Sequence, residues 1–545
     1  MSFSTGFKTW KSIRLFQVCA VSALLWIAMI VSGCGLWKPS VPPLTADQLI
    51  AMTPETCTTA LVFPSFDGAY QALLLLLDRA APENVDVEVE AQVVARPLAT
   101  MAGEPDATDI IDIAMAKGID PAQPLALYLG SGTSSASLDA STQETLPSGV
   151  VNPAALIKQI IEQRPFVAVL PRYSQKYIEQ AVEDWSKGKG VREEALAGIE
   201  PGLRIREDGR LCWFFTPEGI VIGNSADLAK EVAARRQQPA DIPHDAEATA
   251  TADLIQIVRG TKTPSDDQRE TGPLAVTADL LGALLDAGED GVPTVVTWRV
   301  GESALEATAR RPADTNNAPA LPRLAPLLPS DANGFVALPL SDEGVSMVQG
   351  MVGGLGMSDS LPGDAQSLLE SMSGELAVAT TEGASGRPNV VVLTHLKTGK
   401  AQELLESAAT ALTVEMYNGV RIVSVPVPGD SGYEVQYALL NDTLAAATQM
   451  GDVKTAIDRL QSGKPSGLFT KLDPPLDPAA PPSTAIVAKT SFFSDVFVPL
   501  LSQRGAFPSE RVKLVESMFA KVQELRITSN VEDKAKVTRL SVRVQ

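Results

Sequence analysis

The fold is decided by three short runs, VRIVSV (420–425), YEVQYA (433–438) and LAAA (444–447). The first two are rich in β-branched and aromatic residues, and Pro, Gly, Asn and Asp lie between the runs, as is typical of strands joined by turns. The connections at 426–430 and 441–442 are too short for a crossover helix. The stretch therefore predicts three consecutive antiparallel strands.

Helical patterns lie on both sides of these strands. Upstream, apolar residues at helical spacing predict a helix over 401–412, which follows a strand at 390–393. Downstream, Val453, Ile457 and Leu460 share one face of a helix that begins near Asp452 and ends at Gly463. The predicted order is strand, helix, three strands and helix.

The same order occurs earlier in the chain. Its elements are a strand at 165–170, a helix from Ser174 through Trp185, strands at 203–205, 211–215 and 220–222, and a helix over 226–236. Pro165 and Pro388, 223 residues apart, precede corresponding strands, and Asp227 and Asp452, 225 residues apart, open the closing helices. This near-constant spacing predicts an internal duplication.

The outer parts of the two repeats also correspond. Strands at 61–64 and 335–339 are each followed by an apolar helix, and hairpins at 294–310 and 525–544 each follow a helix, predicted over 276–285 and 512–522. We therefore expect an α+β fold of two related modules, each a mainly antiparallel sheet with helices packed on one face.

The predicted boundaries follow from these patterns. The first module spans 57–310, the Pro-, Ala- and Asn-rich segment 311–326 is a linker, and the second module spans 327–545. The extra length of the first module includes an expected strand at 84–94, where valines alternate with acidic residues, and a Gly/Ser/Thr-rich loop over 130–148.

The N-terminus has the pattern of an export signal. Lys8, Lys11 and Arg14 precede the uncharged run 16–32, which is shorter than the roughly 20 residues of a spanning helix. The run ends in Val31-Ser32-Gly33-Cys34, which resembles the lipobox of bacterial lipoproteins. The resemblance implies a signal peptide over 1–33 and an acylated Cys34. The alternative is an uncleaved single-span anchor.

The anchor would place the rest of the chain in the cell envelope. The resemblance implies several acyl chains on Cys34, which hold a protein on a membrane stably. In lipoproteins an Asp after the cysteine favours the inner membrane, and Gly35 at this position favours the outer membrane. Residues 34–56 are expected to be a tether, with the modules facing the periplasm.

Four phrases of the second module resemble an uncharacterised family of bacterial envelope proteins. They are LPSD (328–331), SGELAVA (373–379), YNGVRI (417–422) and GLF (467–469). The resemblance implies an envelope protein and carries no catalytic residue to this chain.

Charge and cysteine content narrow the function further. The net charge of −20 becomes −23 without the leader, which argues against binding to nucleic acid or adsorption to anionic lipid. Cys19 lies in the leader and Cys34 in the lipobox, which leaves Cys57 and Cys212. In an exported protein these two either form a disulfide or are small buried side chains.

Catalytic motifs are absent from the sequence. The chain has two histidines, His244 in a loop and His395 after a strand, and it lacks CxxC, HExxH, GxSxG and P-loop spacings. Asp266-Asp267 and Glu289-Asp290 fall in expected loops, where solvated charge is the simpler interpretation. We therefore predict no catalytic, cofactor-binding or metal-binding residue.

The sequence favours a lipid-anchored envelope protein that acts by binding or scaffolding, with a protein of the envelope as partner and no catalysis. One alternative is a carrier of lipid or hydrophobic cargo, lined by the apolar helices 69–79 and 344–356. The other is a periplasmic hydrolase that uses carboxylates in a groove between the modules.

Overall fold

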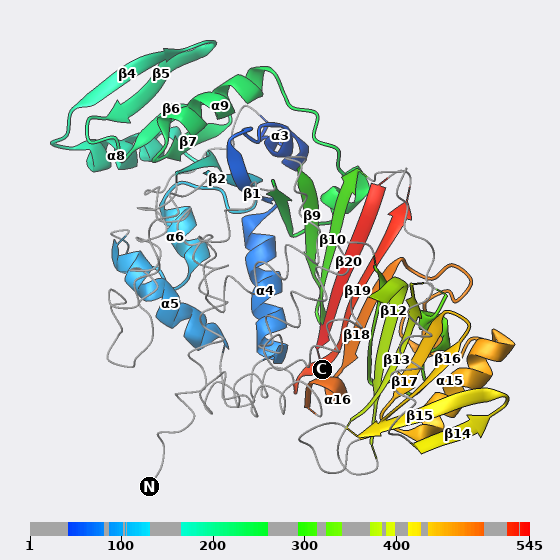
Figure 1. Cartoon of the computed structure of the whole chain (residues 1–545). Helices are drawn as coiled ribbons and strands as arrows, with labels where there is room; N and C mark the ends of the chain where they lie inside the picture. Colours follow the sequence, from blue (N-terminus) through cyan, green and yellow to red (C-terminus); the bar gives the residue numbers. More distant parts are fainter. Residues whose placement is uncertain are drawn as a thin grey trace, which may run out of the picture. The chain divides into compact units, whose positions relative to one another are not determined.

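The computed structural model describes residues 42–80, 87–101, 104, 106–130, 165–259, 293–312, 323–340, 371–383, 388–397, 413–426, 434–494, 520–532 and 535–544. The chain divides into two compact units, Met1–Arg311 (unit 1) and Pro312–Gln545 (unit 2) (Figure 1). The predicted helices over 276–285, 344–356 and 401–412, most of that over 512–522, and most of the loop over 130–148 lie outside the described residues.

Unit 1 combines an antiparallel sheet with several helices. Its elements are α3 (Ala46–Ala51), β1 (Cys57–Phe63), α4 (Phe66–Ala80), α5 (Val87–Met101), α6 (Ile110–Ala116), β2 (Leu125–Gly130), β3 (Phe166–Pro171), α8 (Gln175–Ser186), β4 (Val191–Leu196), β5 (Ile199–Arg206), β6 (Cys212–Phe215), β7 (Gly219–Gly223), α9 (Ala226–Gln237), α10 (Ala246–Ala250), β8 (Leu254–Val258), β9 (Thr294–Val300) and β10 (Ala304–Pro312). The strands pair antiparallel in the order β10-β9-β8-β1-β2-β3-β7-β6-β5-β4.

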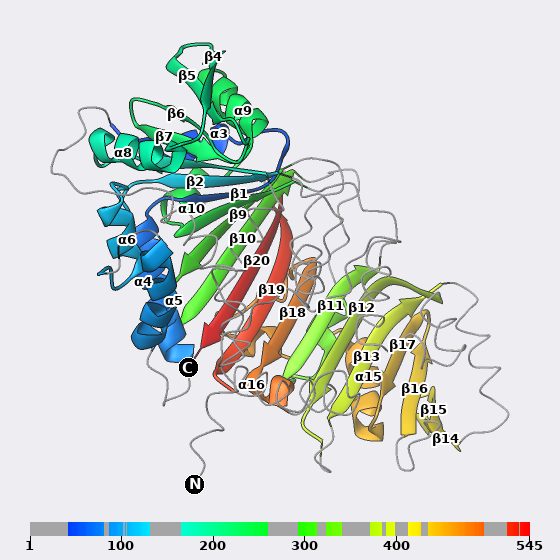
Figure 2. The ribbon, with the colours of Figure 1, turned by 90° about the vertical axis from the view of Figure 1, so that its left-hand side faces the viewer.

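Helices cover both faces of the unit 1 sheet. On one face Phe63 of β1 packs with residues of α4, α5, α6 and α8. On the other, Val62 of β1 packs with α3 and α9 (Figure 2). The prediction of helices on one face is therefore wrong for this unit. Every residue of β3 is buried, which is the continuous apolar pattern of a strand covered on both sides.

The expected strand at 84–94 is also wrong, because α5 occupies Val87–Met101. Val87 is 4% exposed, whereas Val89, which a strand would place on the same face, is 50% exposed. Ala95 and Ala99 are buried with Val87, at spacings that share one helical face. The alternation of valine and acidic residues is short, and the helical pattern becomes clear only when Ala95 and Ala99 are included.

Unit 2 is also built on an antiparallel sheet. Its elements are η3 (Ala325–Leu327), β11 (Gly334–Leu340), β12 (Met372–Thr381), β13 (Asn389–Leu396), β14 (Thr413–Tyr417), β15 (Val420–Pro426), β16 (Glu434–Leu440), β17 (Thr443–Ala447), α15 (Met450–Ser462), η5 (Phe469–Lys471), β18 (Thr484–Lys489), α16 (Thr490–Phe492), β19 (Val522–Glu532) and β20 (Ala535–Val544). The strands pair in the order β20-β19-β18-β11-β12-β13-β17-β16-β15-β14 (Figure 2).

The unit 2 sheet buries apolar residues on both faces. On one face Ala337, Leu393 and Ala445 form a cluster that includes Ala456 of α15. On the opposite face Leu338 and Leu376 belong to a second cluster. The chain therefore has an α+β fold with a large antiparallel sheet, as the sequence predicts.

The last strand lies inside the fold, as predicted. Leu540 and Val544 of β20 are buried and Arg539 is exposed. Leu540 is paired with Ile527 of β19. The end of β20 is therefore part of the sheet.

The assignment of α5 can be tested by charge substitution. Val87→Asp should lower the free energy of unfolding by about 2 kcal/mol or more, because it buries an unpaired carboxylate. Val89→Asp should change it by less than about 0.5 kcal/mol, because its side chain is half exposed. Urea denaturation followed by circular dichroism measures both. Equal losses in the two variants would contradict the helix, because a strand places both side chains on one face.

Candidate functional site

Several predicted features lie outside the described residues. These are Cys34 with the rest of the leader, the pair Asp266-Asp267 and the pair Glu289-Asp290. The structure therefore places none of them. Within the described residues, no group of three or more His, Cys, Asp and Glu side chains could hold a metal ion. The same residues include no helix that is both long and apolar enough to cross a membrane.

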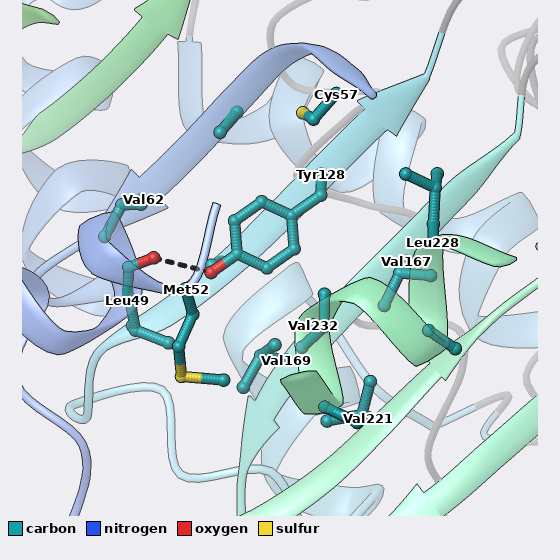
Figure 3. Close-up of a cluster of buried hydrophobic side chains, with 14 of the residues drawn as sticks. Leu49, Met52, Cys57, Val62, Tyr128, Val167, Val169, Val221, Leu228 and Val232 are labelled. Atoms are coloured by element: carbon teal, nitrogen blue, oxygen red, sulfur yellow. Dashed lines mark hydrogen bonds between the residues drawn. The ribbon is translucent and has the colours of Figure 1, made fainter. Parts of the chain in front are cut away.

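Cys57 and Cys212 are free thiols, both buried in the same apolar cluster (Figure 3). The Cys57 Sγ donates to the Thr59 carbonyl at 3.0 Å, and the Cys212 Sγ donates to the Gly223 carbonyl at 3.5 Å. Burial raises the pKa of each thiol to about 12, although these carbonyl contacts and nearby cations act in the opposite direction. Of the two arrangements that the sequence leaves open, the structure has the unbridged one, with both thiols in a weakly nucleophilic state.

The two histidines have different surroundings. His244 lies before α10 and contacts the Ile242 carbonyl and the Asp47 carboxylate. His395 lies within β13, not after a strand as expected, and its Nδ1 is 3.0 Å from the Thr443 Oγ1. Neither contacts a second histidine or a cysteine in the printed interactions of the described residues, so no nucleophile–base pair or metal site is formed around them.

In unit 1, polar side chains of α9 hold two neighbouring segments of chain. One segment is the β4–β5 hairpin, and the other is the loop that leads into β1. The contacts run from the Lys230 Nζ to the Glu194 Oε2 at 2.6 Å, from the Gln237 Nε2 to the Ala197 carbonyl, and from the Arg235 Nη2 to the Glu55 Oε1. The hairpin contacts fix the sheet edge against the helix.

In unit 2, α15 holds the corresponding segments. They are the β14–β15 hairpin and the segment that leads into β11. The contacts run from the Lys454 Nζ to the Glu415 Oε1 at 2.6 Å, from the Gln461 Nε2 to the Asn418 carbonyl at 3.3 Å, and from the Arg459 Nη1 to the Leu327 carbonyl at 3.0 Å. We call each set of three contacts the helix clamp.

The YNG phrase forms the turn that this clamp holds. Asn418 and Gly419 have φ values of 45° and 78°, the left-handed conformation of a two-residue hairpin turn. The Tyr417 hydroxyl and the Asn418 amide donate to the two carboxylate oxygens of Asp458 at 2.9 and 2.8 Å. This phrase therefore serves the packing of the hairpin on α15.

The SGELAVA phrase also serves the fold. Glu375 is 6% exposed and accepts hydrogen bonds from the backbone N–H groups of Arg323, Leu324 and Ala325 at 2.6, 3.0 and 2.9 Å. A buried carboxylate is stable when it is bonded in this way. Leu324 and Ala325, which the sequence assigns to a linker, are buried by this attachment.

Asp452 is the polar group that packing leaves least satisfied near the clamp. Its Oδ2 is buried without a hydrogen-bond partner. Desolvation and, secondarily, the charge of Asp331 raise the pKa of Asp452, and Arg459 lowers it. Desolvation also lowers the pKa of Arg459. These three side chains form a partly buried acid–base group that can hold a proton, and sequence reasoning missed it because they lie 121 or more residues apart from Asp331 along the chain.

The thiol chemistry can be tested by alkylation without a reductant. Iodoacetamide should leave Cys57 and Cys212 unmodified in the native chain at pH 8, because burial of both suppresses the thiolate. The same reagent should modify both after unfolding in guanidinium chloride, as read by peptide mass spectrometry. Resistance to alkylation in the unfolded chain would instead show a disulfide.

The burial of Asp452 predicts the direction of a pH effect on stability. Because folding raises its pKa, its contribution destabilises the fold above the folded pKa, and this destabilisation is relieved as pH falls through that value. Asp452→Leu should increase the free energy of unfolding at pH 7 by about 1 kcal/mol, because it removes an unpaired buried oxygen. Urea denaturation followed by circular dichroism between pH 4 and 8 measures this.

Two further variants serve as controls for Asp452. Asp452→Asn should flatten the pH dependence, since it removes the titrating group. Leu228→Asp, at the corresponding buried position of α9, should destabilise unit 1. A loss of stability in Asp452→Leu at pH 7 would contradict the unfavourable role of this carboxylate.

A scan against known protein families and a search of curated proteins find no match to this chain. Among solved structures, crystal form IV of TP0453 is similar at a TM-score of 0.23, with 10% identity over 41% of this chain and 94% of TP0453. Crystal form I of TP0453 gives a TM-score of 0.19, with 10% identity over 78% of this chain and 99% of TP0453. These likenesses are too low to assign a fold or a function.

Proposed function

We propose that the chain is a lipid-anchored protein of the bacterial cell envelope, built from two copies of one module, that acts by binding or scaffolding. The anchor is Cys34, and the modules face the periplasm, with the outer membrane favoured by Gly35. The observation that carries the two-module part of this proposal is the strand order of the two units.

The strand order supports duplication. Among the described residues each unit has ten strands, and replacing β1 through β10 by β11 through β20 converts the order of unit 1 into that of unit 2. In both, the helix α9 or α15 follows the seventh strand. Two unrelated sheets of this size would have many other arrangements available.

The helix clamp supports duplication at the level of side chains. Lys230 and Lys454 are 224 residues apart, and the same spacing relates the clamp arginines Arg235 and Arg459. It also relates Gln237 to Gln461. The lysines and glutamines contact corresponding hairpins. This spacing pairs Asp452 with Leu228, one position from the pairing with Asp227 that the sequence pattern suggests.

The two copies differ at one edge of the sheet, and this difference supports a binding role for unit 2. In β14, Val414 is 43% and Met416 is 65% exposed, and among the described strands β14 pairs only with β15. The corresponding positions in β4 are Glu193 and Ala195. A charge protects an edge strand from pairing, whereas an apolar edge accepts an extended partner segment. We therefore place the partner-binding edge at β14.

The proposal can be tested by site-specific photocrosslinking in cells. A photoreactive residue at Met416 should yield a discrete crosslinked protein, because the side chain is exposed beside an open edge. The same residue at Ala195 in β4 is the matched control and should yield none. Equal crosslinking at both positions, or none at Met416, would contradict the binding edge.

The anchor is tested separately with Cys34→Ala. The wild-type chain should remain in the membrane fraction after a carbonate wash, because acyl chains hold it there. The variant should appear in the soluble fraction. Persistence of the variant in the washed membranes would contradict lipidation as the means of attachment.

A further inference from the structure

His244 joins two segments that are far apart in the sequence. Its Nδ1 is 2.7 Å from the Ile242 carbonyl oxygen, and its Nε2 is 3.1 Å from the Oδ1 of Asp47 in α3. Both partner atoms are acceptors when the carboxylate is ionised. Each contact is therefore a hydrogen bond only if the ring nitrogen carries a proton.

A neutral imidazole has one N–H and cannot donate to both partners. We infer that His244 is a pH-sensitive clasp, which holds the first turn of α3 to the 242–244 loop when the ring is doubly protonated and releases it when the ring loses a proton. The proton that leaves is the one on Nε2 if the shorter contact to Ile242 is kept. The side chain of His244 is 20% exposed, so solvent protons reach the ring.

The charges around the ring set the direction of the effect. Asp47 lies in the first turn of α3, where the helix dipole favours a negative charge, and the protonated ring adds a cation beside it. Asp245, the next residue, caps α10 and is 3.3 Å from Arg310 of β10. The other charged side chains on these elements are Asp241 and Glu247. Acidic groups outnumber cations here, which favours the protonated ring at lower pH.

The clasp acts on the start of α3 and leaves the rest of the helix docked. Leu49 and Ile50 are fully buried, and the Tyr128 hydroxyl donates to the Leu49 carbonyl at 2.6 Å (Figure 3). The Ala240 N–H also donates to the Ala51 carbonyl at 2.9 Å. Because these contacts do not depend on histidine, loss of the clasp frees only the turn that contains Asp47.

The position of this turn gives the clasp its consequence. The described chain begins at residue 42, and α3 is its first helix, directly after the segment expected to be the tether. Protonation of His244 therefore sets whether the chain is held to unit 1 from Asp47 onward or from Leu49 onward. The inference stands on the geometry of His244 and does not require lipidation or a partner.

His395 provides an internal control. Its Nδ1 faces the Thr443 hydroxyl, which can either donate or accept a hydrogen bond. That contact therefore survives a change of protonation. Because the chain has two histidines, the imidazole signals in a nuclear magnetic resonance spectrum can be assigned with His244→Gln and His395→Gln alone.

The test is amide hydrogen exchange of the full chain at pH 5.5 and 7.5, corrected for the intrinsic effect of pH. The Leu49 and Met52 amides, which bond to the carbonyls of Thr45 and Gln48, report on α3. Their protection should be about two- to five-fold higher at pH 5.5, the range expected for a partly exposed ion pair. Nitrogen-15 spectra should show protons on both ring nitrogens of His244 in the protected state.

The variants decide between outcomes. His244→Gln and Asp47→Asn should each remove the pH dependence in α3, whereas His395→Gln should keep it. Amides of the central strands serve as the control for folding and should stay protected in all variants. Unchanged protection of α3 between the two pH values in the wild-type chain, or a pH dependence that persists in His244→Gln, would overturn the clasp.

Discussion

The structure depends on covering the central strands of each sheet on both faces. In unit 1, residues of β3 contribute to apolar clusters on opposite sides, one with α4, α5, α6 and α8 and the other with α3 and α9. Burial of apolar surface is the largest favourable contribution to folding, so these strands require helices from distant parts of the chain. The helix clamp completes this arrangement at one edge, where ionic and amide contacts hold the outer hairpin to α9 or α15.

Much of the fold could be predicted from the sequence because its elements have strong local patterns. The strands at 220–222 and 444–447 and the helix that ends at Gly463 are bounded by turn or cap residues, and the structure places β7, β17 and α15 there. The strand β4 escaped prediction because its exposed, charged residues lack the alternation of a half-buried strand. The valine alternation near residue 87 misled in the opposite way, since tertiary packing favours a helix there.

The polar sites were harder to predict because proximity, not residue type, creates them. His244 is an isolated histidine in the sequence, and its meaning depends on Asp47, which lies almost two hundred residues earlier. The same holds for Glu375, whose burial is compensated by backbone groups of the preceding segment. A motif search finds neither, because the chemistry arises from acceptors and donors that the fold brings together. The duplication was visible in the sequence because it preserves order and spacing.

The free state of Cys57 and Cys212 has a consequence for how the protein matures. Each thiol is enclosed by apolar side chains and bonded to a nearby carbonyl, so the native packing already accommodates two reduced sulfurs. A chain that closes its core around reduced sulfur does not wait for an oxidant to reach its final form. In an oxidising compartment, the order of events then matters: collapse of the core must precede encounter with disulfide-forming enzymes, and the rate of folding itself becomes the protection against mispaired cysteines.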